Sequence, residues 1–181
     1  MRSLTAALAL ILAAGCGGEP AKEYTPAQKP AMGVARLMPK NGTTVRGFVS
    51  FTQNGDKVAV AGDFFELYSG SHSLYIHEVG NCSSPNAASA GRVWNVPGNT
   101  SDKRTGELRQ LRVGSEGHAE FSYTLSDVSV GTGKPNDVIG HSVVVHATVD
   151  TDPKPEFGVR NGWLACGVIQ RSEGLNLKGI L

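Results

Sequence analysis

The residues of this chain that are best suited to metal chemistry gather in two short segments far apart in the sequence. Residues 72–82 contain Tyr75 and His77, and a second histidine-bearing segment ends at His146. Side chains two residues apart on a β-strand point to the same face, so Tyr75 and His77 are expected to face together. His141 lies five residues before His146, so it is expected to point the other way, into solvent. Imidazole is the commonest metal ligand in proteins, which makes these histidines the first candidates for chemistry.

Three segments resemble the copper/zinc superoxide dismutase family, and they occur in that family's order. Residues 72–82 read H-S-L-Y-I-H-E-V-G-N-C, similar to the family's strand and loop H-G-F-H-V-H-x-x-G-x-C. Residues 140–146 read G-H-S-V-V-V-H, similar to its second copper strand G-R-x-x-V-V-H, and residues 164–169 read L-A-C-G-V-I, like its C-terminal motif. The resemblance implies that His77 and His146 match two of the family's four copper ligands.

The other two copper positions carry different residues. Tyr75 stands where the family has a histidine; it either fills the vacated volume or, as a phenolate, helps to bind copper. The ligand that bridges copper and zinc belongs to a G-x-H motif followed by an aromatic residue, Asn or Asp, and Pro. Residues 91–97 read G-R-V-W-N-V-P, which puts Val93 in the histidine position. An isopropyl group cannot coordinate a metal, so any copper would be held weakly, by His77 and His146.

The zinc positions are replaced as well. The family motif H-x-G-D-L-G-N corresponds to residues 104–110, which read R-T-G-E-L-R-Q. Arg104 therefore brings a fixed cation to a histidine position, and Glu107 takes the aspartate position. The sequence has no histidine between His77 and His118. Zinc sites need about four nitrogen, sulfur or oxygen ligands, so zinc is not expected here.

Further positions are interpreted through the same resemblance. His72 matches a histidine that buttresses the copper strand without binding metal, and Asp150 matches an aspartate that orients ligand histidines through hydrogen bonds. Trp163 takes the place of the arginine that guides superoxide to copper, and it is expected to cap the pocket with apolar surface. Arg160 could reach the site only if the loop 158–162 is rearranged.

The pattern of apolar residues predicts the elements that must position these side chains. Period-two alternation and β-branched runs predict eight strands, at residues 33–38, 44–53, 57–67, 73–79, 107–113, 118–125, 142–149 and 164–170. Asn54-Gly55 and Glu116-Gly117 are predicted hairpin turns, and 80–106 and 126–140 are predicted long loops. The fold class is therefore all-β, an eight-stranded Greek-key barrel or sandwich of the copper/zinc superoxide dismutase type.

The N-terminal residues indicate export. Residues 1–15 resemble a lipoprotein signal peptide, with Arg2 before a short apolar stretch and a small-residue box before Cys16. Cys16 would be diacylated and would anchor the mature chain to a membrane without a spanning helix; plain secretion is the alternative. Residues 16–32 are predicted to be a flexible lipidated tether, and 33–181 a single superoxide dismutase-like domain. The predicted location is the bacterial cell envelope, facing the periplasm or the exterior.

The cysteines and the charge fit that location. With Cys16 bound to lipid, Cys82 and Cys166 are left as a pair in an oxidising compartment, and both coincide with the family's intrasubunit disulfide. Two free buried thiols are the alternative. Without Arg2, sixteen basic side chains face sixteen acidic ones, so nucleic acid is not an expected partner. The membrane is contacted through the lipid alone, and the sequence identifies no protein partner.

Three functions follow from these residues. The sequence favours a non-catalytic family member that serves as a scaffold or interaction module in the envelope. The first alternative is a copper-binding protein that stores or passes Cu(I) through His77 and His146, assisted by Tyr75 or His72. The second alternative is a residual copper-dependent superoxide dismutase whose site is rebuilt from other ligands. Two imidazoles hold Cu(I) well, but Cu(II) favours four equatorial ligands, which argues against an efficient redox cycle.

Overall fold

A computed structural model describes residues 29–147 and 162–172 of the chain, which form eight β-strands and one turn of 3-10 helix. The elements are β1 (Met32–Pro39), β2 (Arg46–Asn54), β3 (Lys57–Phe65), β4 (Gly70–His77), η1 (Ala88–Ala90), β5 (Glu107–Val113), β6 (Ala119–Leu125), β7 (Ser142–His146) and β8 (Trp163–Arg171). Across the described residues, no helix is long and apolar enough to cross a membrane. The eight predicted strands are all present.

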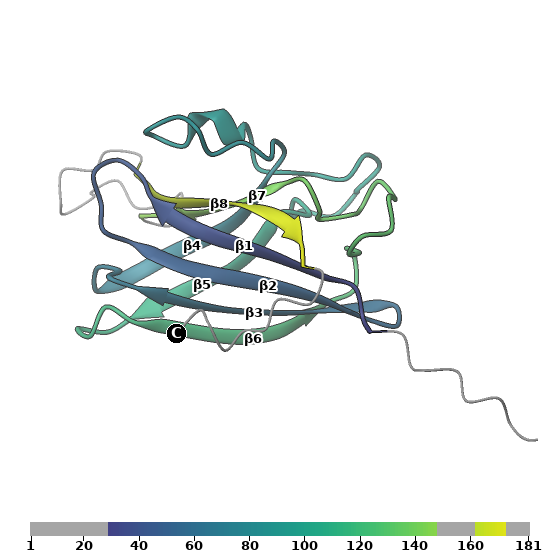
Figure 1. The fold of residues 1–181 in the computed structure, drawn as a ribbon, viewed down its shortest axis with the longest axis horizontal. Coiled ribbons are helices and arrows are strands. Elements are labelled where there is room, and N and C mark those ends of the chain that lie inside the picture. Colours follow the sequence, from purple (N-terminus) through teal and green to yellow (C-terminus); the bar gives the residue numbers. More distant parts are fainter. Residues whose placement is uncertain (1–28, 148–161, 173–181) are drawn as a thin grey trace, which may run out of the picture.

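The strands form one antiparallel sheet that curls into a nearly closed barrel. Their order is β5-β4-β7-β8-β1-β2-β3-β6, so β4 pairs with both β5 and β7, and β3 pairs with β6. These non-consecutive pairings are Greek-key connections. Figure 1 shows β1, β2, β3 and β6 running side by side at the front, with β4 and β5 behind them. The all-β fold class is thereby confirmed.

The barrel interior is filled by the inward-facing side of each strand. Val49 and Phe51 on β2 are fully buried, as are Val60 and Phe64 on β3. Ser50 on β2 and Ala61 and Asp63 on β3 alternate with them and are partly exposed, as expected of a sheet with one buried face. Removing a ring such as that of Phe51 would cost about 3–5 kcal/mol of stability. This core gives the flanking strands a rigid base on which functional side chains can be placed.

The two predicted hairpin turns have different outcomes. Asn54 pairs with Lys57 and Gly55 has φ 60°, so the first turn does join two paired strands. Gly117 also has a positive φ, of 67°, but the strands it connects, β5 and β6, lie at opposite ends of the sheet order. The prediction of a hairpin at 116–117 is therefore wrong. The turn at Gly117 was predicted correctly, but whether β5 and β6 pair is decided by how the barrel closes.

The long connection between β4 and β5 is attached to the barrel by backbone hydrogen bonds. Ile76 N–H donates to the Gly106 carbonyl at 2.8 Å, and Ile76 C=O accepts from Trp94 N–H at 2.9 Å. A Cβ on Gly106 would lie 2.3 Å from the Ile76 carbonyl oxygen, so only glycine allows the loop to approach this closely. The loop residues that the sequence compares with metal ligands are thus held against β4.

Candidate metal centre

The two candidate copper ligands lie at the ends of neighbouring strands. His77 ends β4 and His146 ends β7, next to Trp163 at the start of β8. Val93, from the long loop, makes an isolated antiparallel bridge with His77. We call His77, His146, Tyr75, Val93 and Trp163 the histidine corner.

The imidazoles of His77 and His146 meet directly. Their Nε2 atoms are 3.2 Å apart, well within the distance expected of two ligands of one metal. His77 Nδ1 lies 2.8 Å from the Gly91 carbonyl oxygen, which can only accept a hydrogen bond. His77 Nδ1 must therefore carry a proton, and in the neutral ring its Nε2 is an acceptor. It follows that His146 donates from its own Nε2 to His77 Nε2.

The electrostatics of the pair favour this neutral state. Burial lowers the pKa of His77 below its ordinary value, although the Gly91 carbonyl acts in the opposite direction. Burial lowers the pKa of His146 further, to about 3; the positive charge that His77 carries when protonated and the charge of Arg104 add to the effect. Desolvation disfavours a charged ring, and a second cation close by disfavours it again. Both imidazoles are consequently neutral at pH 7, as metal ligands must be.

Aromatic rings enclose the pair on two sides. The Tyr75 ring meets His146 edge to face with centroids 4.6 Å apart. The Trp163 ring lies 4.8 Å from the His77 ring and stacks on the His146 ring at 5.3 Å. Such ring pairs contribute about 0.5–1.5 kcal/mol beyond the area they bury. Packed aromatic side chains therefore occupy both positions: Tyr75 that of a copper ligand, and Trp163 that of the guiding arginine.

The donors of this corner fit copper only in part. Metal–nitrogen bonds of about 2 Å allow any nitrogen separation up to about 4 Å, so the two Nε2 atoms could share one ion. A copper ion held there would supply redox chemistry, for which Cu(II) favours four ligands. Among residues 29–147 and 162–172, however, no group of three or more His, Cys, Asp or Glu side chains could hold a metal. The residues present fit a two-coordinate ion and do not fit the four-ligand site.

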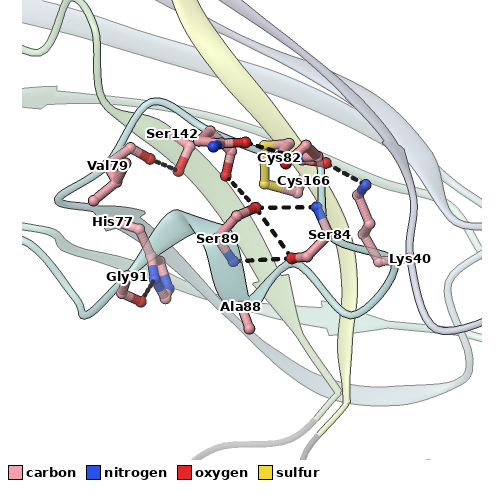
Figure 2. The surroundings of a disulfide bond; sticks show 12 residues. Lys40, His77, Val79, Cys82, Ser84, Ala88, Ser89, Gly91, Ser142 and Cys166 are labelled. Carbon is pink, nitrogen blue, oxygen red and sulfur yellow. Dashed lines mark hydrogen bonds between the residues drawn. A yellow bond between two sulfur atoms is a disulfide. The ribbon is translucent and has the colours of Figure 1, made fainter.

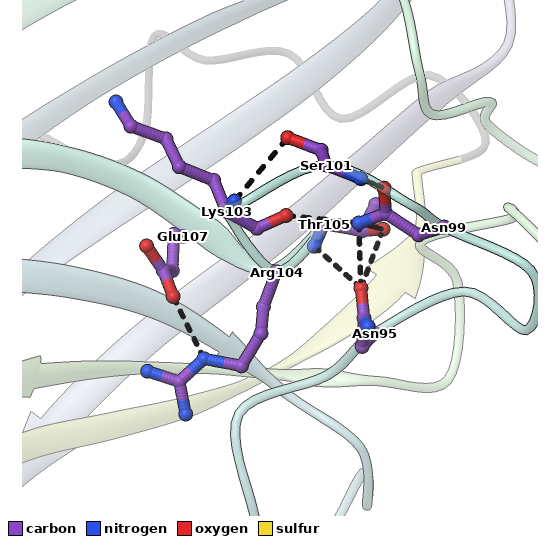
Figure 3. A network of polar contacts seen from close by, with 7 residues as sticks. All are labelled: Asn95, Asn99, Ser101, Lys103, Arg104, Thr105 and Glu107. Atoms are coloured by element: carbon purple, nitrogen blue, oxygen red, sulfur yellow. Dashed lines mark hydrogen bonds and ion pairs between the residues drawn. The ribbon is translucent and has the colours of Figure 1, made fainter.

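The region compared with the zinc site carries an ion pair and an asparagine network. Arg104 Nε donates to Glu107 Oε1 at 2.7 Å, which engages the one carboxylate in the matched motif. Asn95 Oδ1 accepts from the Thr105 backbone N–H at 3.0 Å and from Asn99 Nδ2 at 2.7 Å (Figure 3). A guanidinium paired to the only matching carboxylate does not fit a zinc ion.

The remaining histidines have structural surroundings. His72 is buried, and its Nε2 is 2.7 Å from the Tyr68 carbonyl oxygen, which ties the start of β4 to the preceding turn. His141 is half-buried; its ring lies 4.3 Å from that of Trp94, centroid to centroid, and its Nδ1 lies 3.0 Å from the Glu78 carbonyl oxygen. The expectation that His141 sits in solvent therefore holds only in part, because Trp94 of the long loop covers one side of the ring. His118 pairs with Asp63 on the neighbouring strand.

A second feature of the same strands is the Cys82–Cys166 disulfide, which confirms the predicted pairing. The two Cα atoms are 5.7 Å apart, and Cys166 packs with the fully buried side chains of Ala87, Ala90 and Val144. We call these five residues the disulfide corner. Figure 2 shows the loop around them held by further hydrogen bonds, among them the Ser84 backbone N–H to Ser89 Oγ and Ser142 Oγ–H to the Val79 carbonyl. The disulfide thus fastens the long loop to β8.

Several predicted positions cannot be placed. Cys16, Asp150 and Arg160 lie outside the described residues. Two features of the site were missed from the sequence. The Gly91 carbonyl that fixes the His77 tautomer has no side-chain signal. Ser73 is buried on the face that carries Tyr75 and His77, and the two-residue period of the strand could have indicated this.

Comparison with known proteins shows which proteins this chain is similar to. The family described as copper/zinc superoxide dismutase (SODC) matches residues 45–169. Superoxide dismutase [Cu-Zn] 2 of Brassica juncea is 31% identical over 150 residues, which is 76% of this chain and 95% of the relative. Superoxide dismutase [Cu-Zn] of Onchocerca volvulus is 31% identical over 145 residues, 71% of this chain and 90% of the relative. Extracellular superoxide dismutase [Cu-Zn] of Brugia pahangi is 30% identical over 156 residues, which is 78% of this chain and 76% of the relative.

Proposed function

Since the chain belongs to the copper/zinc superoxide dismutase family, we propose that it is a non-catalytic member, which keeps the fold and has lost the metal-dependent dismutation of superoxide. Dismutation requires a copper ion that changes oxidation state reversibly, a proton donor and a cationic path for the anion. In this chain a residue that serves each requirement is replaced. Tyr75 takes a copper-ligand position, Val93 the position linked to the proton donor, and Trp163 the position of the cation on the anion's path. The domain would then act as a scaffold or interaction module.

The observation that carries the proposal is the packing around the two histidines. The rings of Tyr75 and Trp163 lie within 4.6 to 5.3 Å of the imidazole rings, centroid to centroid, at the positions where the resemblance expects a ligand and a guiding cation. Val93 adds a side chain without donor atoms directly beside His77. Arg104 places a fixed positive charge near both imidazoles, which disfavours a bound cation. Function depends on such site residues and not on the fold.

The proposal is tested on the purified chain carrying Cys16→Ser, after incubation with copper and zinc and removal of loosely bound metal. We expect no stoichiometric zinc by elemental analysis, and superoxide dismutation no faster than that of an equal amount of loosely bound copper. The matched control is the same chain with Tyr75→His and Val93→His, in which two imidazoles return to the corner. One tightly bound copper per unmodified chain, with activity that a chelator abolishes, would instead establish a residual dismutase.

We further propose that the domain is exported and attached to the bacterial envelope through a lipid on Cys16. The support is the charged, apolar and small-residue order of residues 1–15 and the polar, proline-containing tether that follows. Fractionation of cells producing the full chain should recover it with membranes, and Cys16→Ala should release it or block its maturation. Recovery with membranes, at the level of the parent, of a Cys16→Ala chain that has lost residues 1–15 would refute lipid anchoring.

A second candidate function is copper binding without catalysis. The observation that favours it is the 3.2 Å separation of the His77 and His146 Nε2 atoms, with His77 already oriented by Gly91. Two converging neutral imidazoles suit Cu(I). Loading with Cu(I) under reducing conditions should give one ion per chain at most, and His77→Gln or His146→Gln should abolish binding. His141→Gln, a half-buried histidine outside the pair, is the control and should leave binding unchanged.

A further inference from the structure

A surface hollow of about 250 Å³ lies between β4 and β5, beside the histidine corner. It results from an irregularity in the strand pairing: Ser73 pairs with Gln110, but Tyr75 pairs with Glu107, so β5 contains one extra residue at this point. Such a bulge separates the two strands locally and redirects their side chains. The volume is many times the ~10–15 Å³ that one water needs. The hollow can therefore take a small molecule or ion.

Ser73 provides the first sign that the hollow has a ligand. Ser73 is one of the residues that line the hollow and is only 3% exposed, yet its buried Oγ has no hydrogen-bond partner among the described residues. A buried hydroxyl without a partner destabilises a protein, and alanine would avoid that cost at the same position. A ligand in the hollow that accepts a hydrogen bond from Ser73 would remove the penalty.

The charges around the hollow indicate the chemistry of that ligand. Lys103 and Arg109 both line it, although the Arg109 guanidinium lies 5.6 Å over the ring of Tyr123, outside the hollow. Lys103 therefore supplies the nearer free positive charge. Glu107 also lines it, but its carboxylate accepts a hydrogen bond from Arg104 at 2.7 Å. Figure 3 shows Lys103 and Arg104 leaving the loop in different directions, with Glu107 paired to Arg104. The net charge at the hollow is therefore positive, which favours an anion.

We propose that this hollow binds a small oxyanion, with the Ser73 hydroxyl and the Lys103 ammonium as its principal donors. A phosphate or a carboxylate group offers the acceptor oxygens that both donors need, and a hydrogen bond to an ionised acceptor is about twice as strong as a neutral one. The hollow lies beside the residues that the resemblance aligns with the family's zinc ligands, so this chain would bind an anion in the region where the family binds a cation. The inference does not depend on the absence of dismutase activity, because the hollow and its donors lie outside the two-histidine pair.

Inorganic phosphate and acetate are the probes, used in separate titrations of the full chain carrying Cys16→Ser. Nitrogen-15 NMR should show saturable shifts of the amides around Ser73, Tyr75 and Lys103. Saturation with phosphate identifies a phosphate site, and saturation with acetate alone identifies a carboxylate site. Ser73→Ala and Lys103→Gln should each weaken binding about tenfold, the effect of one lost charge-assisted hydrogen bond. The phosphate-dependent rise in melting temperature should fall in parallel.

Lys134→Gln is the matched control, because Lys134 is an exposed lysine in the loop between β6 and β7, away from the hollow. It should leave the affinity unchanged. Ser73→Ala removes only an unpartnered hydroxyl and should fold, and Lys103→Gln alters an exposed side chain, so the two variants check each other. The proposal is overturned if neither anion saturates the amides around Ser73. It is equally overturned if Ser73→Ala and Lys103→Gln bind the anion as tightly as the Lys134→Gln control.

Discussion

The disulfide corner and the histidine corner are built on the same strands but are stabilised by different interactions. In the disulfide corner a covalent bond joins the long loop to β8, and small apolar side chains pack around it. In the histidine corner two imidazoles share one hydrogen bond, and aromatic rings cover them. The first corner keeps both cysteines of the family's disulfide, whereas the second keeps only His77 and His146 of the copper ligands. The same backbone path nevertheless accommodates both sets of side chains.

This difference indicates that the barrel does not need the metal site for its geometry. The loop that should carry the bridging ligand is still fixed to β4 by the hydrogen bonds of Ile76 with Trp94 and Gly106, which involve backbone atoms only. Side chains such as Val93 can therefore change without moving the loop. The cost falls instead on the two remaining imidazoles, since His77 is buried and His146 half-buried, and both must stay neutral.

Removing the disulfide should have the largest effect, because it breaks the corner that fixes the loop. Against a Cys16→Ser parent, the further changes Cys82→Ser and Cys166→Ser open a loop of 84 residues. The chain-entropy model gives a loss of about 4.5 kcal/mol in the free energy of unfolding. Urea denaturation with and without a reductant measures it, and reduction of the parent should reproduce the mutant. A change below about 1 kcal/mol would mean that packing, and not the bond, holds this corner.

Acid should weaken the histidine corner before it affects the disulfide corner. The pKa of His146 is about 3 in the folded protein and about 6.5 in an unfolded chain, so between these values the unfolded state binds a proton that the folded state does not. Stability therefore falls as the pH drops from about 6.5 toward 3, by up to about 1.4 kcal/mol per pH unit. His146→Gln should reduce this slope in urea titrations at pH 7, 5.5 and 4.5. An unchanged slope would contradict the assignment.

Restoring imidazoles should convert the histidine corner toward a metal site. Tyr75→His with Val93→His places two new rings beside the existing pair, since Tyr75 already contacts His146 and Val93 bridges His77. We expect copper affinity to rise by at least about tenfold, with smaller gains for either change alone. Competition with a chelator of known affinity measures the gain. Adding His77→Gln to the double variant should erase it, and an equal gain in that background would place the copper elsewhere.

Much of the fold could be predicted from the sequence, because strand periodicity is a local property. All eight strands were predicted, and strand 107–113 has the predicted bounds. The hairpin at 116–117 was predicted wrongly, because pairing of β5 with β6 depends on closure of the whole barrel. That His77 and His146 lie close together was predicted from the motifs that contain them. The contact of the His141 ring with Trp94 depends on loop packing, and the lack of a hydrogen-bond partner for the Ser73 hydroxyl depends on a bulge; neither leaves a periodic signal.

The smallest expected effect concerns Arg104, which lies at the edge of the histidine corner. Its side chain is 43% exposed and that of Glu107 is 28% exposed, so their ion pair is worth at most about 1 kcal/mol. Arg104→Gln should therefore change the free energy of unfolding by less than that, and it should not create zinc binding, because Glu107 alone cannot hold the ion.

Arg104 also lowers the pKa of His146 through its charge, although burial and the charge of His77 have larger effects. The substitution should consequently raise the pKa of His146 slightly, whereas Arg92→Gln, which removes an exposed arginine paired with Glu78, serves as the control. NMR titration of the His146 ring measures the shift. A pKa that does not move would show that Arg104 acts on Glu107 alone, and that burial and His77 account for the neutrality of the corner.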